Sequence, residues 1–362
     1  MKNRLMYLFL GCALFATSCV SNSNNEENLP AAEVKNVIYM IGDGMGVSQI
    51  QVALTALGGE KTAFDMCQYS GFARTYSSSN YITDSAASGT ALATGNKTNN
   101  GVIGMSADST NVYSVLKDFE DTERPTGLVV TSYITHATPA AFYAHQVSRN
   151  LYEEIAVDLL HSGVDYFAGG GRKHFINRAD SVNLVDSLIA KGYEIDFELD
   201  LVEPVKSLPY GLLAADDHMP SFAERGGFLP AAVEQAINSL DAEDKGFFLM
   251  VEGSQIDFCG HGNDQTCLTG EMLDFERAVQ IALDFAAKDG NTLVVITADH
   301  ETGGAVVLDG SYADSTLDVT FTTGNHTGTI VPIFSYGPSA EKFSGIMENI
   351  EIPQRIREIM EK

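Results

Sequence analysis

Short apolar runs alternate along the chain with segments whose apolar residues recur at helical spacing. The runs have the length and composition of buried parallel strands, and they cover Val34 to Ile41, Leu128 to Ser132, Phe247 to Val251, Thr292 to Thr297 and Ile330 to Ser335. Leu268 to Lys288 is the clearest helical segment, because one of its faces carries most of its apolar residues. This alternation predicts an α/β fold with a large, mostly parallel central sheet and helices on both of its faces.

The organisation along the chain is simple, because no repeat and no long linker divides it after the first residues. We expect one domain over residues 34–362. Residues 176–227 are polar and acidic with a poor strand pattern, so we expect an insertion over or beside the sheet there.

The N-terminus has the features of an export signal. Lys2 and Arg4 precede an apolar run from Leu5 to Ala16, which is too short to span a bilayer comfortably, so residues 1–19 are predicted to be a signal peptide. The end of this segment, ATSC, resembles a bacterial lipobox whose Cys19 becomes lipidated, although leucine is more usual where Ala16 stands. Residues 20–33 are polar and form a predicted tether. The protein is thus expected to be exported, either to the periplasm or as a lipid-anchored protein of the bacterial cell envelope.

Composition narrows the classes of partner. The net charge of −26 repels polyanions, so no nucleic-acid-binding surface is expected. Once the signal is removed, Cys67, Cys259 and Cys267 remain besides Cys19, which is too few for a disulfide scaffold. Cys259 and Cys267 could pair across a short loop, and the sequence leaves this open.

Ionisable residues follow the predicted strands. In doubly wound sheets, ligands bind beyond the carboxyl ends of the strands, and these ends are followed by or include Asp43, His136, Thr138, Glu252, Asp299 and His300. Asp257 and His261 would share a face if their segment is helical, and His326 could add another imidazole. A lone histidine or aspartate is more often an ordinary residue or a helix cap. The joint pattern favours metal ions, with zinc suited to mixed nitrogen and oxygen ligands and magnesium to oxygen.

The stretch TDSAASGTALATG, residues 83–95, predicts a helix that begins near Ser85 and stays small. A helix N-terminus favours an anion, so Ser85 would stand at an anion site. The small residues would let the helix approach the sheet and the metal ions closely. The simpler alternative is that Thr83 or Asp84 only caps a buried helix.

The motifs together resemble the alkaline phosphatases of the bacterial and animal type. The residues that carry this resemblance occur in the family's order and cover nearly all of the chain from Val34 onward: IGDGMG, TDSAASGTALATG, KTNNGVIG, HATPAAFYAHQVSR, GGG, VEGSQID with His261, TADHETGG and HTG.

The resemblance implies a phosphate monoester hydrolase that acts on small substrates through a phosphoserine at Ser85, with Arg149 binding the phosphate. It implies two zinc ions, the first held by Asp257, His261 and His326 and the second by Asp43, Asp299 and His300. It also implies a third ion, magnesium, near Asp43, His136, Thr138 and Glu252, and a homodimer. None of these roles falls on His145, His161, His174 or His218.

The sequence departs from the family pattern at two positions, and two alternative functions stand beside this interpretation. Position 136 is histidine where the best-known bacterial members have aspartate, so the third ion could be zinc. Phe258 stands where many relatives place a cation near the phosphate, and its absence should weaken phosphate binding. The rivals are another esterase of the same superfamily, such as a phosphodiesterase or sulfatase, and a lipid-anchored metal- or phosphate-binding protein without turnover.

Overall fold

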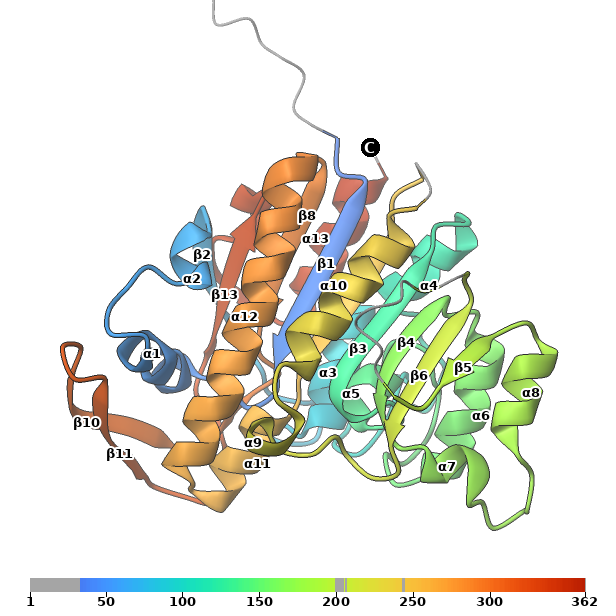
Figure 1. Ribbon diagram of the computed structural model, residues 1–362, viewed down its shortest axis with the longest axis horizontal. Coiled ribbons are helices and arrows are strands. Elements are labelled where there is room, and N and C mark those ends of the chain that lie inside the picture. Colours follow the sequence, from blue (N-terminus) through green and yellow to red (C-terminus); the bar gives the residue numbers. More distant parts are fainter. Residues whose placement is uncertain (1–32, 199–204, 206, 243–244, 362) are drawn as a thin grey trace, which may run out of the picture. The chain divides into compact units, whose positions relative to one another are not determined.

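The strand β1 (Asn36–Gly42) lies between β7 (Phe248–Gly253) and β8 (Thr292–Thr297) in the middle of a 10-stranded sheet (Figure 1). The computed structural model describes residues 33–198, 205, 207–242 and 245–361, which belong to one compact unit. The predicted signal peptide and all but the last residue of the predicted tether lie outside the described residues.

The order across the large sheet is β14, β2, β13, β8, β1, β7, β3, β4, β6, β5. Its other strands are β2 (Tyr69–Arg74), β3 (Thr126–Tyr133), β4 (Tyr166–Gly170), β5 (Glu194–Asp196), β6 (Tyr210–Ala215), β13 (Val331–Tyr336) and β14 (Gly345–Glu348). Two small two-stranded sheets are formed by β9 (Glu301–Thr302) with β12 (His326–Thr327) and by β10 (Ala305–Ser311) with β11 (Thr316–Phe321).

The five predicted strands are all present, but one of them runs in the other direction. β13, which contains most of the predicted strand Ile330 to Ser335, is antiparallel to both of its neighbours, β2 and β8. The prediction of a parallel strand was therefore wrong here. A fully buried apolar run has the same pattern in either direction, because the pattern reports burial on two faces and not the chain direction. The remaining pairs in the large sheet are parallel.

Helices pack on both faces of the sheet, as predicted. α12 (Gln265–Asp289) and α10 (Phe228–Leu240) lie side by side over one face (Figure 1). α12 contains the predicted helix, and it buries Met272, Phe275 and Val279 toward the sheet. The other helices are α1 (Val47–Ala56), α2 (Ala63–Met66), α3 (Ser85–Thr94), α4 (Val115–Asp121), α5 (Ala137–Ala140), α6 (Tyr152–Ser162), α7 (Lys173–Ile176), α8 (Leu184–Ala190), α9 (Phe222–Arg225), α11 (Gln255–Gly262), α13 (Glu351–Met360) and a 3-10 turn at Ala340–Phe343.

Residues 176–227 differ from the expectation of an insertion beside the sheet. Part of this region forms β5 and β6, and β6 pairs in parallel with β4, so the region extends the sheet at one edge. The sequence YGLLAA of β6 is short and ends in small residues, which explains why its strand pattern is weak.

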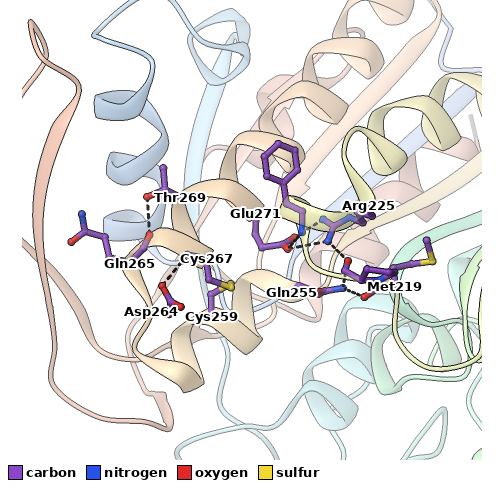
Figure 2. The surroundings of a disulfide bond; sticks show 11 residues. Met219, Arg225, Gln255, Cys259, Asp264, Gln265, Cys267, Thr269 and Glu271 are labelled. Carbon is purple, nitrogen blue, oxygen red and sulfur yellow. Dashed lines mark hydrogen bonds and ion pairs between the residues drawn. A yellow bond between two sulfur atoms is a disulfide. The ribbon is translucent and has the colours of Figure 1, made fainter.

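A disulfide joins Cys259 in α11 to Cys267 in α12, with their Cα atoms 5.4 Å apart (Figure 2). This resolves the pairing that the sequence left open. Cys67 is the free cysteine of the described part of the chain. None of the helices described here is long and apolar enough to span a membrane.

Candidate metal centre

The strands that deliver ionisable residues are adjacent in the sheet. β8, β1, β7 and β3 follow one another in the sheet order, and their carboxyl ends meet at one rim. Asp43 directly follows β1, Glu252 lies near the end of β7, and Asp299 comes shortly after β8. The exposed fraction of each of these three residues is 0%. The predicted site residues on the strand ends are therefore brought together, deep inside the protein.

A first group of possible ligands consists of Asp257, His261 and His326. His261 Nδ1 donates to the carbonyl of Gly324 at 2.8 Å, and His326 Nδ1 donates to that of Thr83 at 2.9 Å. These bonds leave each neutral imidazole with a lone pair on Nε2. The two Nε2 atoms lie 3.1 Å from each other, and Asp257 Oδ1 lies 3.4 Å from one and 3.5 Å from the other.

Three acceptors that converge in this way repel one another unless a proton or a metal cation lies between them. Histidines that bind metals usually donate their other ring N–H to a carbonyl or a carboxylate, as both imidazoles do in this group. Asp257 and His261 lie on α11 at the i and i+4 positions, as predicted from their spacing. The residues of this group fit a metal ion with mixed nitrogen and oxygen ligands.

A second group consists of Asp43, Asp299 and His300. His300 Nε2 lies 3.0 Å from Asp299 Oδ2 and 3.5 Å from Asp43 Oδ1. Asp299 Oδ1 accepts from the backbone N–H of Gly44 at 3.1 Å and from that of His300 at 2.9 Å, which fixes the carboxylate. Burial, reinforced by the charges of nearby carboxylates, raises the pKa of Asp43 well above its usual value. Such an arrangement of buried carboxylates requires protons or cations.

A third group consists of Asp43, His136 and Glu252. Glu252 Oε2 accepts from the hydroxyl of Ser254 at 2.6 Å, while Oε1 is buried without a hydrogen-bond partner among the described residues. Thr138 Oγ1, in α5, is likewise buried and unpaired within the described structure. Burial raises the pKa of Glu252 to about 7. These unsatisfied oxygens fit a cation that prefers oxygen ligands.

Ser85 is the first residue of α3, and the predicted helix is confirmed. Its Oγ lies 3.3 Å from His300 Nε2, so the hydroxyl stands beside the second group. All ten residues of α3 are buried. A Cβ added to Gly89 would lie 3.2 Å from the Cα of Thr138 in α5, so this glycine permits the close approach of the two helices. The small residues of this stretch thus let α3 pack against the segment that carries Thr138.

Arg149 is linked to the start of α3 through Asp84, the residue that precedes Ser85. The guanidinium donates from Nη1 to Asp84 Oδ2 at 3.2 Å, and its Nη2 lies 3.2 Å from His136 Nε2. Burial, together with the charge of Arg149, lowers the pKa of His136 to about 3, so this imidazole is neutral. The arginine is therefore held between Asp84, which precedes Ser85 in the chain, and His136 of the third group.

Several supporting residues were missed by the sequence analysis. Thr302 donates its hydroxyl to Asp257 Oδ1 at 2.5 Å, and Ser254 and Ser132 both donate to Glu252 Oε2. Gly44 has φ +75, and a Cβ there would lie 2.9 Å from the Cα of Asp257. Gly44, Ser254 and Thr302 lie within the quoted motifs IGDGMG, VEGSQID and TADHETGG, but the motifs alone gave them no role. Ser132 was predicted only as the end of a strand.

Two of the unassigned histidines lie near the third group. The His218 ring stacks on Tyr133 with centroids 3.5 Å apart, and its edge contacts are with His136 and Phe258. Phe258 itself packs against His136, with ring centroids 6.1 Å apart. His174 accepts or donates at 2.7 Å from Thr135 Oγ1. An aromatic wall made by Tyr133, His218 and Phe258 thus borders the third group.

Comparison with known proteins supports one family. The family model described as alkaline phosphatase matches residues 34–315. Alkaline phosphatase 3 of Bacillus subtilis is 35% identical, over 90% of this chain and 88% of that protein. The alkaline phosphatase of Escherichia coli is 30% identical, over 90% of this chain and 86% of that protein.

Solved structures give the same result. The alkaline phosphatase from the Antarctic bacterium TAB5 superposes with a TM-score of 0.87 at 41% identity, covering 91% of this chain and 99% of that one. A variant of that enzyme, with a histidine replaced by glutamate, has Mg bound in a site named M3. It is 40% identical to this chain and has the same TM-score of 0.87, covering 91% of this chain and 99% of that one.

Proposed function

The chain belongs to the alkaline phosphatase family and is a phosphoric monoester hydrolase, and from this premise we propose that Ser85 is its nucleophile. The observation that carries the proposal is the position of Ser85 Oγ, 3.3 Å from His300 Nε2 at the N-terminus of a helix. The free N–H groups of that terminus favour the anion that develops there.

In the proposed reaction, Ser85 Oγ attacks phosphorus as the bond to the leaving alcohol breaks, which leaves a phosphoserine. Water then attacks the phosphoserine, the bond to Oγ breaks, and inorganic phosphate is released. Arg149 offers parallel N–H donors to two phosphate oxygens and orients the phosphoryl group in both steps. Asp84 holds the guanidinium in place for this task.

We propose that two Zn²⁺ ions occupy the first and second groups and that Mg²⁺ occupies the third. The first two groups supply imidazole nitrogen with carboxylate oxygen, which suits zinc. Asp43, Glu252 and Thr138 make the third group rich in oxygen, which suits magnesium, while the nitrogen of His136 allows zinc as the alternative. When bound, such ions lower the pKa of a hydroxyl and neutralise charge on entering and leaving oxygens.

We further propose that the protein is exported and attached to the cell envelope through a lipidated Cys19, and that it works as a homodimer. The N-terminal sequence supports the first proposal, and the resemblance to the family supports the second. Mass spectrometry of the mature N-terminus tests lipidation, and sedimentation equilibrium tests the dimer. An intact N-terminus without lipid would overturn the anchor but not the enzyme assignment.

The experiment for the nucleophile compares the wild type with Ser85→Ala and, as a control on the same helix, Ser88→Ala. The rate on a phosphate monoester should fall roughly 10³-fold or more in Ser85→Ala, with metal content and circular dichroism unchanged. Acid-quenched enzyme should carry labelled phosphate in the wild type and in Ser88→Ala only. Hydrolysis of a phosphate diester and of a sulfate ester is measured as well, to test the phosphodiesterase and sulfatase alternatives. Labelling of Ser85→Ala would show that the nucleophile is misassigned.

A further inference from the structure

Glu301 directly follows His300 of the second group, and its exposed fraction is only 5%. It belongs to none of the three groups of possible ligands found among the described residues. A carboxylate buried in this way is costly unless hydrogen-bond donors surround it. The donors that contact Glu301 therefore show which segments it holds together.

Donors from three places in the chain converge on this carboxylate. Oε1 accepts from Gln49 Nε2 at 2.8 Å and from the backbone N–H of Ala305 at 3.0 Å, and Oε2 accepts from the hydroxyl of Thr327. Both oxygens of Glu301 are thus satisfied without a cation. The oxygens of Asp43, in contrast, are buried without a hydrogen-bond partner within the described structure, as expected of a metal ligand.

Thr327 is the residue after His326 of the first group. The two form β12, a strand of two residues that pairs with β9, so that Thr327 lies opposite Glu301 and His326 opposite Thr302. Two short paired strands are at best marginally stable by themselves. The side-chain hydrogen bond from Thr327 to Glu301 therefore adds a second tie between β12 and β9. It joins the neighbour of a first-group ligand to the neighbour of a second-group ligand.

Gln49 extends this connection to α1. Its Nε2 also donates to the carbonyl of Thr302 at 2.9 Å, and its Oε1 accepts from the backbone N–H of Gly46 at 3.1 Å, shortly after Asp43. A Cβ on Gly46 would lie 2.5 Å from Cγ of Glu301, so this glycine lets the side chain approach closely. Glu301 thus contacts segments that carry ligands of both the first and the second group.

We propose that Glu301 is a positioning residue that fixes β12, and with it His326, at the distance from the second group that a pair of metal ions requires. This inference rests on the proposed occupation of the two groups by zinc. Two ions can stabilise both the entering and the leaving oxygen of a displacement when they are held about 3.5–4 Å apart. Residues that orient ligands without binding the metal change metal affinity or activity by about 10- to 100-fold when they are replaced.

The test is titration of the full-length, zinc-loaded protein with a chelator at constant excess Mg²⁺, with the zinc that remains counted per chain. In Glu301→Ala, one of the two zinc ions should be lost at a chelator concentration about tenfold lower than in the wild type, while the other is retained. Glu276→Ala is the matched control, because Glu276 is also a buried glutamate and accepts from the backbone N–H of Ala63 at 2.8 Å. It should lose stability and keep the zinc affinities of the wild type.

Thr327 tests the same contact from the other side and serves if Glu301→Ala does not fold. Thr327→Val removes the donor and should weaken one zinc ion as Glu301→Ala does, whereas Thr327→Ser keeps the hydroxyl and should retain the wild-type affinity. Circular dichroism reports whether each variant is folded.

The proposal is overturned if folded Glu301→Ala or Thr327→Val holds both zinc ions as the wild type does. It is also overturned if Thr327→Ser behaves as Thr327→Val, or if Glu276→Ala loses zinc to the same extent as Glu301→Ala. A wild type that holds no zinc would overturn the proposed metal sites, and the role of Glu301 with them. That result is distinct from a wild type with two zinc ions whose variants all behave alike.

Discussion

Arg149 and Asp84 are joined at 3.2 Å between Nη1 and Oδ2, and the same carboxylate begins the helix of the proposed nucleophile. Asp84 Oδ1 accepts from the backbone N–H of Ala87 at 3.0 Å, and Oδ2 also accepts from that of Gly101 at 3.0 Å. Asp84 is therefore both the cap of α3 and the partner of the arginine. One side chain fixes the position of the Ser85 hydroxyl relative to the guanidinium.

Replacement of Asp84 by alanine should weaken phosphate binding. Without its partner, Arg149 is no longer held over the site, so the inhibition constant for inorganic phosphate should rise about tenfold. Loss of the cap should lower the free energy of unfolding by about 1 kcal/mol. Asn183→Ala removes the cap of α8 and is the matched control. It should cost similar stability and leave phosphate inhibition unchanged, and an unaltered inhibition constant in Asp84→Ala would contradict the role of the pair.

Phe258→Lys should tighten inhibition by inorganic phosphate several-fold. Phe258 borders the third group, with its ring centroid 6.1 Å from that of His136, so a lysine there would bring a cation toward bound phosphate. Phe258→Leu keeps the site neutral and should show no tightening. Steady-state inhibition at fixed ionic strength measures both. Equal inhibition constants for the lysine and leucine variants would rule out the electrostatic explanation.

The disulfide should stabilise the helix that carries Asp257 and His261, two of the three residues of the first ligand group. Cys259 lies between Asp257 and His261 on α11, and its bond to Cys267 closes a loop with a sequence separation of 8. Loop closure of this length is worth about 2–3 kcal/mol. The double variant Cys259→Ser with Cys267→Ser should unfold at lower denaturant and retain less zinc on dialysis. Cys67→Ser alters the free cysteine and should change neither the unfolding transition nor the zinc content.

Arg225 should be essential for the packing of α9 against α12 and therefore for the stability of the protein. Its guanidinium contacts Glu271 and Asp274, and the exposed fractions of the three side chains are 2%, 2% and 0% (Figure 2 shows Arg225 and Glu271). Arg225→Ala would leave two buried carboxylates without their cation, which costs about 3–5 kcal/mol. Arg277→Ala, on the same helix as the two acids, is the control and should cost less than about 1 kcal/mol. Urea unfolding measures both.

Glu120 should make stability depend on pH in a defined window. Burial raises its pKa from 4.5 to about 7, so between these values the native state holds a proton that the unfolded chain has released. The free energy of unfolding should therefore fall as pH rises through this window, by up to about 3 kcal/mol, and stay level above it. The difference between Glu120→Gln and the wild type isolates this contribution. If that difference does not change between pH 5 and about 7, the carboxyl titrates normally.

Much of the fold could be predicted from the sequence, because buried strands and amphipathic helices have distinct periods. The strand before Asp43 and the helix over residues 268–288 were both predicted close to their observed positions. The antiparallel direction of β13 was not predicted, since an apolar run carries no information about strand direction. β6 was also missed, because its short apolar run ends in small residues and lies within a polar region.

The candidate site was predictable where ligands follow strands or repeat along a helix. The structure brings together all three groups of residues that the family resemblance implied. The supporting contacts were harder to predict from the sequence. The hydroxyl of Thr302 donates to Asp257 across 45 residues of sequence, and no sequence pattern pairs these two positions. The contacts of Glu301 were not predicted at all, since Gln49 and Thr327 come from separate segments that only packing brings together.

The position of β1 has a consequence for how the chain is made. Its partners in the sheet are Phe248–Gly253 and Thr292–Thr297, which are synthesised long after it. During synthesis, β1 therefore has no pairing partner until β7 and β8 have been made. Pairing between strands so far apart in the sequence slows folding. Asp43, at the end of this strand, meets Asp299 only after that pairing. A nascent chain interrupted before residue 292 should contain neither a complete sheet centre nor a complete second ligand group.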